Sequence, residues 1–164
     1  MQPFDIEERV QRAIAFFNEG YNCSQSVFMA YADLYGYTPD TAAAVSSSFG
    51  GGIGRLRETC GAVSAMAMLA GLRYPASDPG NQTAKKTNYS VTRNMVKHFT
   101  DLFGAIKCGE LLKILPGTKE EASPSPRTPE YYAKRPCGRF VEHAARISGK
   151  MLVGEIGEEY RANA

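Results

Sequence analysis

The apolar residues of this chain recur every three or four positions along most of its length, and this spacing constrains its fold more than any other feature. One example is the set Ile6, Val10, Ile14 and Phe17, which a helix would place on one face. No segment alternates apolar and polar residues over a length that would indicate a sheet. The sequence therefore predicts an all-α protein.

Helix boundaries follow from capping residues, glycines and prolines. Gly20 and Gly36 follow the first two periodic stretches, and a glycine in that position commonly ends a helix. Thr38 and Pro39 combine an N-cap residue with a first-turn proline, which indicates a third start, and Pro136 opens the last helix. We expect a bundle of about six or seven helices, covering roughly residues 6–19, 22–35, 39–49, 60–72, 83–103, 108–115 and 136–153.

Residues 62–72 are apolar or small at nearly every position, after Thr59 as the expected helix cap. The run is much shorter than the ~20 residues that cross a bilayer. It is therefore predicted to be the central and most buried helix of the bundle. The next helix should also turn one face to the core, through Val91, Met95, Phe99 and Leu102.

The domain organisation follows from the length of 164 residues, which fits one domain with a sizeable core. Residues 116–135 contain four prolines and many charged or small polar residues, which predicts a long loop. Too little chain follows this loop to build a second core. We expect one helical domain over residues 1–164, with a polar tail at residues 155–164.

The charge pattern excludes some classes of protein. A formal net charge of +2 is too small to favour nucleic-acid binding. The first ten residues, MQPFDIEERV, carry acids where a signal peptide has a basic and then an apolar region. No membrane association is expected, and we predict a cytoplasmic protein, hence one in a reducing compartment.

Four single cysteines are the candidate site residues: Cys23, Cys60, Cys108 and Cys137. They are at least 29 residues apart, and no CxxC pair occurs, so neither a zinc ribbon nor a thioredoxin-like motif is present. Their number alone is typical of inert core cysteines. Their surroundings favour chemistry: three are followed by glycine, although with 16 glycines in 164 residues fewer than one such neighbour is expected. A glycine there would let another sulfur or a substrate approach the thiol.

Each cysteine also falls in the first turn of an expected helix, where free N–H groups and the helix dipole favour a thiolate. Cations flank three of them, and Arg55 and Arg57 precede Cys60. Cys23 has Glu19 nearby and no adjacent cation, so its thiol should be the least acidic. We therefore predict Cys60 as the nucleophile with a lowered pKa. The resolving thiol would come from the other three: Cys108, Cys137 or Cys23.

A glycine-rich run, Gly50-Gly51-Gly52-Ile53-Gly54, separates two of the expected helices. Glycines in a tight turn between helices are its commoner explanation. The alternative is a weak cradle for an anion or substrate at the start of the next helix, built from Gly51, Gly52, Gly54 and Arg55. In either case we expect the loop to shape the approach to Cys60.

Several of these segments together resemble the C_GCAxxG_C_C family of redox-active proteins, over roughly residues 5–153. The segments are Tyr21-Asn22-Cys23-Ser24-Gln25, Phe49-Gly50-Gly51-Gly52-Ile53-Gly54 and Thr59-Cys60-Gly61-Ala62, followed by Cys108 and Cys137. Ala65 stands where the family's motif has its final glycine, which bears on helix contact there and not on the cysteines. The resemblance implies a redox role and supplies no substrate, mechanism or catalytic residue.

Three functions stay open. Thiol redox chemistry, as in an oxidoreductase, needs no cofactor, and its partner would be another redox protein or a small thiol or disulfide. A metal or iron–sulfur site would instead use the four cysteines together as ligands. A third alternative is a non-catalytic interaction protein with buried thiols, and self-association into a homo-oligomer is also open. The distances between the sulfur atoms separate these alternatives.

Overall fold

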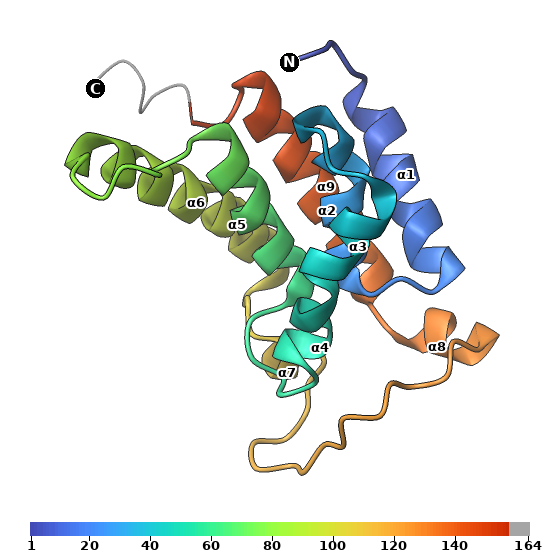
Figure 1. Cartoon of the computed structure of the whole chain (residues 1–164). Helices are drawn as coiled ribbons and strands as arrows, with labels where there is room; N and C mark the ends of the chain where they lie inside the picture. Colours follow the sequence, from blue (N-terminus) through green and yellow to red (C-terminus); the bar gives the residue numbers. More distant parts are fainter. Residues whose placement is uncertain (158–164) are drawn as a thin grey trace.

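The computed structural model describes residues 1–157, and within them the fold is all-α, as predicted (Figure 1). The long helices pack side by side, and short turns gather at one end of the bundle (Figure 1). The elements are α1 (Ile6–Glu19), α2 (Cys23–Ala32), η1 (Asp33–Tyr35), α3 (Pro39–Ser46), η2 (Ser47–Phe49), α4 (Gly50–Ile53), α5 (Gly61–Arg73), α6 (Gln82–Phe103), α7 (Cys108–Leu111), α8 (Pro129–Lys134) and α9 (Cys137–Val153).

The helix starts and ends lie close to the positions that the sequence predicts. Asn22 and Gln25 form a reciprocal capping box at α2, in which each side chain accepts a backbone N–H of the other residue. Thr38 caps α3 and Pro39 is its first residue, as expected. Gly20 ends α1 with a φ of 107°, a conformation that side chains disfavour.

The most buried helix is α2, and the prediction for residues 62–72 is wrong on this point. Eight of the ten α2 residues are buried, against seven of thirteen in α5. The reason is that α1, α3, α5 and α9 all pack against α2 and enclose it, whereas α5 has α2, α6 and α9 as its main neighbours. Met68 and Leu72 of α5 are only partly buried as a result.

The buried face of α6 agrees with the prediction at Val91, Met95 and Phe99, which are fully buried, but Leu102 is 54% exposed. Leu102 lies in the last turn of α6, before Gly104 ends the helix. Phe140, Ala144, Ile147 and Met151 of α9 are all buried, at the spacing of one helix face.

Three boundaries differ from the expectations. The N-cap of α5 is Cys60 rather than Thr59, because Thr59 forms an isolated antiparallel bridge with Lys107. The helix α7 ends at Leu111, and the left-handed backbone of Lys113, with a φ of 56°, excludes further helix. The expected loop at residues 116–135 contains α8, which Thr128 caps.

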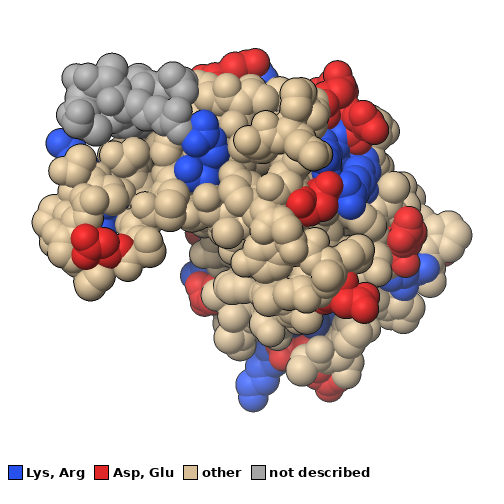
Figure 2. Space-filling model, turned by 45° about the horizontal axis from the view of Figure 1, so that its top comes forward, with Lys and Arg blue, Asp and Glu red and all other residues tan. Residues whose placement is uncertain are grey.

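The chain after α9 is described only in part. Ile156 is 5% exposed and packs into the core, so the expected tail is not free at that residue. Residues 158–164 of that tail lie outside the described residues. No helix in the described part of the chain is long and apolar enough to cross a membrane. Figure 2 shows cationic and acidic side chains interspersed on the face drawn, which is consistent with the small net charge.

Candidate functional site

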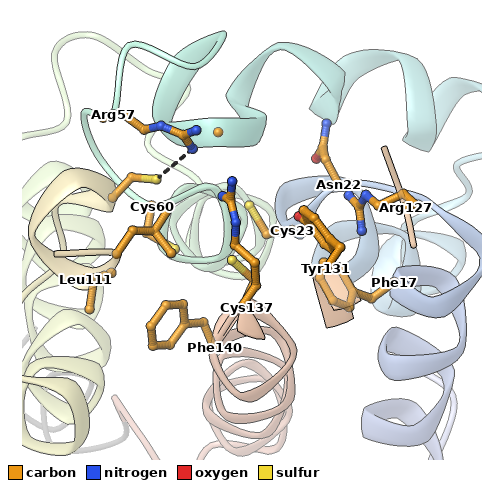
Figure 3. Close-up of a pocket in the computed structure, with 14 residues that line it drawn as sticks. Phe17, Asn22, Cys23, Arg57, Cys60, Leu111, Arg127, Tyr131, Cys137 and Phe140 are labelled. Carbon is orange, nitrogen blue, oxygen red and sulfur yellow. Dashed lines mark hydrogen bonds between the residues drawn. The ribbon is translucent and has the colours of Figure 1, made fainter. Parts of the chain in front are cut away.

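All four cysteines line one small cavity, of about 60 Å³, at the end of the bundle where the short turns gather. Cys23 is the first residue of α2, Cys60 is the N-cap of α5, and Cys108 and Cys137 are the first residues of α7 and α9. Figure 3 shows the labelled Cys23, Cys60 and Cys137 converging on this space from three helices. The expectation that each cysteine lies at a helix start is therefore confirmed.

The Cys23 sulfur packs against Gly61, the residue after Cys60, and the Cys23 and Cys60 thiols influence each other's pKa. All four cysteines are free thiols.

Gly61 explains how Cys23 comes so close to the start of α5. A Cβ atom at Gly61 would lie 2.6 Å from the Cys23 sulfur and 2.7 Å from the Phe49 carbonyl oxygen, which no real side chain tolerates. The glycine after Cys137 does not follow this pattern, since a Cβ at Gly138 would meet its nearest neighbours at 3.8 Å. The close-approach explanation for the Cys-Gly pairs therefore holds at Gly61 and fails at Gly138.

The Cys23 thiolate is held by hydrogen bonds from several directions. The largest contribution comes from the Cys60 thiol, and the backbone N–H groups of Gly51, Ser24 and Gly61 add to it. Together they outweigh the desolvation of a buried charge and lower the pKa of Cys23 to about 6. Cys23 is therefore the acidic thiol of the cavity, although the sequence around it suggested the opposite.

The expected acidity of Cys60 is wrong. The hydrogen bond to Cys23 and burial both raise the pKa of the Cys60 thiol well above its ordinary value, because they favour the protonated form. The negative charge of Cys23 acts in the same direction, and the N–H groups of Ala62 and Val63 only partly oppose it. In the reduced protein Cys60 is therefore protonated near neutral pH.

The two arginines that precede Cys60 in the sequence form their hydrogen bonds with other groups. Arg55 and Arg57 both donate to Glu120, at 2.9 and 2.7 Å, and this carboxylate comes from the long loop after α7. Arg57 also donates to the Cys108 sulfur at 3.7 Å, which the dashed line in Figure 3 marks. Burial nevertheless raises the pKa of Cys108 above its ordinary value.

Cys137 is the fourth thiol of the cavity. Burial raises its pKa to about 11, and the negative charge of Cys23 adds to that effect. The guanidinium groups of Arg135 and Arg127 oppose both contributions without cancelling them. Cys108 and Cys137 are therefore protonated near neutral pH, and Cys23 alone among the four carries a thiolate there.

The glycine-rich run lies beside this site, and one of its residues, Gly51, lines the cavity. Gly51, Gly52 and Gly54 all have left-handed backbones, with φ between 56° and 70°. Of the four residues named for the alternative, an anion cradle, only Gly51 lines the cavity, and Arg55 pairs with Glu120. The loop therefore shapes the surroundings of Cys23, through the Gly51 N–H group, more directly than those of Cys60.

Within residues 1–157, no group of three or more His, Cys, Asp or Glu side chains is arranged to hold a metal ion.

Two residues of the cavity wall were missed by sequence reasoning. Arg127 and Tyr131 lie in the segment expected to be loop, and both line the cavity together with Arg135. The Arg127 guanidinium stacks on the rings of Phe17 and Tyr131, at 4.8 and 4.6 Å from their centres. Their spacing of four residues and the Thr128-Pro129 pair between them were the available signals of a short helix.

Comparison with known proteins gives one family. The model of the C_GCAxxG_C_C family, described as "Putative redox-active protein (C_GCAxxG_C_C)", matches residues 21–151, a span that includes all four cysteines. No curated protein and no solved structure matches the chain. Since the family match covers most of the sequence and spans the four cysteines that line the cavity, this chain belongs to the C_GCAxxG_C_C family.

Proposed function

We propose that this protein is a dithiol oxidoreductase whose working pair is Cys23 and Cys60. The observation that carries the proposal is the packing of the Cys23 sulfur against Gly61, directly after Cys60 at the start of α5, with the acidic sulfur on Cys23. Cys23 would be the nucleophile and Cys60 the resolving thiol, which reverses the roles expected from sequence. A reducing compartment such as the cytoplasm would supply the protein in this dithiol form.

The reaction with a disulfide substrate illustrates the exchange. The Cys23 thiolate attacks one substrate sulfur, a bond forms between them, and the other substrate sulfur leaves as a thiolate. Cys60 then loses its proton and attacks the Cys23 sulfur, which forms the Cys23–Cys60 disulfide and releases the second substrate thiolate. Two protein thiols are oxidised, and one substrate disulfide is reduced to two thiols.

The environment of Cys60 suits this second step. Two of the causes that raise its pKa, the hydrogen bond to Cys23 and the negative charge of Cys23, disappear once Cys23 is bonded to substrate. The N–H groups of Ala62 and Val63 then remain to favour a thiolate on Cys60. Cys60 would therefore become a better nucleophile only after Cys23 has reacted.

The pH dependence of alkylation tests the assignment of the nucleophile. For the reduced protein, we expect the alkylation rate of Cys23 to rise with pH to a midpoint at about 6 and to level off above it. Cys137 should remain slow until the pH approaches about 11, because only its thiolate reacts. Mass spectrometry of each cysteine peptide after timed alkylation, from pH 5 to 9, measures these rates.

The variant Cys60→Ala supplies the control for the cause of this acidity. Without the Cys60 thiol, Cys23 loses the largest of the contributions that lower its pKa, so its midpoint should move upward. A Cys23 peptide that stays unlabelled at pH 7 while Cys60 reacts would contradict the proposed roles.

A further inference from the structure

The charge of the cavity wall points to an anionic ligand. Three arginines line the cavity, Arg57, Arg127 and Arg135, and no aspartate or glutamate does. Arg57 is neutralised by Glu120. Among residues 1–157, Arg127 and Arg135 form no ion pair with a carboxylate. Two positive charges therefore face a space that also holds the Cys23 thiolate.

Arg127 in particular has an unsatisfied donor. One terminal nitrogen, Nη2, donates to the Tyr21 carbonyl oxygen at 3.2 Å. The other, Nη1, is buried and has no hydrogen-bond partner. A buried cationic donor without an acceptor is costly, so a ligand oxygen in the cavity would be stabilised there. Figure 3 shows Arg127 at the edge of the site, beside Phe17 and Tyr131.

The size of the cavity limits the ligand to a few atoms. Its volume of about 60 Å³ is several times the roughly 10–15 Å³ that one water molecule needs. A tetrahedral oxyanion with five heavy atoms is of this order, whereas a peptide or a tripeptide thiol is much larger. Guanidinium groups also bind oxyanions with paired hydrogen bonds.

We propose that the cavity binds a small inorganic oxyanion between Arg127 and Arg135, and that an oxyanion of this class is the oxidant of the Cys23–Cys60 pair. This inference rests on the proposed function and adds the class of its substrate. The two guanidinium groups would offset the repulsion between the bound anion and the Cys23 thiolate.

The reaction is balanced for an oxyanion whose central atom accepts two electrons. The Cys23 sulfur attacks the central atom and bonds to it, and one oxygen leaves as water after taking up two protons. Cys60 gives up its proton and attacks the Cys23 sulfur, so that the sulfur–sulfur bond forms and the bond from Cys23 to the central atom breaks. That electron pair stays on the central atom, which is reduced by two electrons and holds one oxygen fewer.

Arsenate and phosphate are the probes, because they match in shape and charge and only arsenic is reduced by thiols. With the reduced full-length protein, titration calorimetry should measure the dissociation constant of phosphate, which does not react. Arsenate alone should close the Cys23–Cys60 disulfide, with one arsenite formed for each disulfide found by mass spectrometry. Binding of phosphate without oxidation by arsenate would refute the role as oxidant.

Variants locate the binding site. Arg135→Gln should weaken phosphate binding by at least about tenfold, the loss expected for one charged hydrogen bond. Arg139→Gln is the matched control: Arg139 is exposed, lies in α9 and does not line the cavity, so binding should change less than about twofold. Arg127→Lys tests the second guanidinium and serves even if Arg127→Gln does not fold. Thermal unfolding checks that the Arg127→Lys protein is folded.

The outcomes distinguish this inference from the proposed function. If neither ion binds at millimolar concentration, or if Arg135→Gln binds phosphate as well as the unaltered protein, the oxyanion site is refuted. In that case the proposed redox pair still stands, provided that a small aromatic disulfide closes the Cys23–Cys60 bond. If that disulfide also fails to close the bond, both proposals are wrong.

Discussion

Replacing Cys60 by serine is expected to leave Cys23 able to attack a disulfide and unable to complete the exchange. Given one equivalent of a chromogenic aromatic disulfide, the unaltered protein should release two aromatic thiols, and the Cys60→Ser variant should release one. The reason is that the second thiolate leaves only when Cys60 attacks the Cys23 sulfur. A mixed disulfide on Cys23, identified by mass spectrometry, should therefore accumulate.

Two further variants test whether Cys23 is the nucleophile and Cys60 the resolving thiol. Cys23→Ser should release almost no aromatic thiol on the same timescale, because the remaining thiols have raised pKa values. Cys137→Ser should still release two equivalents, since Cys137 lies in the same cavity outside the working pair. If Cys137→Ser traps the mixed disulfide and Cys60→Ser does not, Cys137 is the resolving thiol.

The substitution Gly61→Ala is expected to reduce both the reactivity of Cys23 and the stability of the fold. Its Cβ would need the positions occupied by the Cys23 sulfur and the Phe49 carbonyl oxygen. Forcing α2 away from α5 should lower the free energy of unfolding by about 1–3 kcal/mol, as overpacking usually does. It should also weaken the hydrogen bonds from Gly61 and Cys60 that keep the pKa of Cys23 low.

The pKa values set an upper limit on how much the alkylation of Cys23 can slow. At pH 6 about half of Cys23 is thiolate, and a return to its ordinary pKa of 9.0 would leave about 0.1%. The greater nucleophilicity of the more basic thiolate recovers part of this loss, so alkylation at pH 6 should slow by up to roughly twentyfold. Gly71→Ala is the control in the same helix, because a Cβ there meets nothing within 4 Å. That variant should react normally and be at least as stable as the parent; equal rates and stabilities for both variants would contradict the proposed contact.

Much of the fold followed from local sequence. The bounds of α1 and α9, the cap of α3 and the buried face of α6 depend on contacts within a few residues, and capping residues and apolar spacing report those directly. The local sequence did not predict which helix is the most buried. The short helix α2 is the most enclosed because four other helices surround it, and the number of neighbours in space is not encoded in the spacing of its own residues.

In the candidate site, too, some properties follow from the local sequence and others from the packing of distant segments. The sequence by itself determined which thiols are present and that each begins a helix, because cysteine identity and helix starts are local properties. Only the tertiary structure decided which thiol is acidic. Gly51 and Gly61 donate to Cys23 from far along the chain, and Glu120 draws the two arginines away from Cys60. A thiol pKa responds to donors and charges within a few ångströms, and those neighbours are brought together by packing rather than by adjacency in sequence.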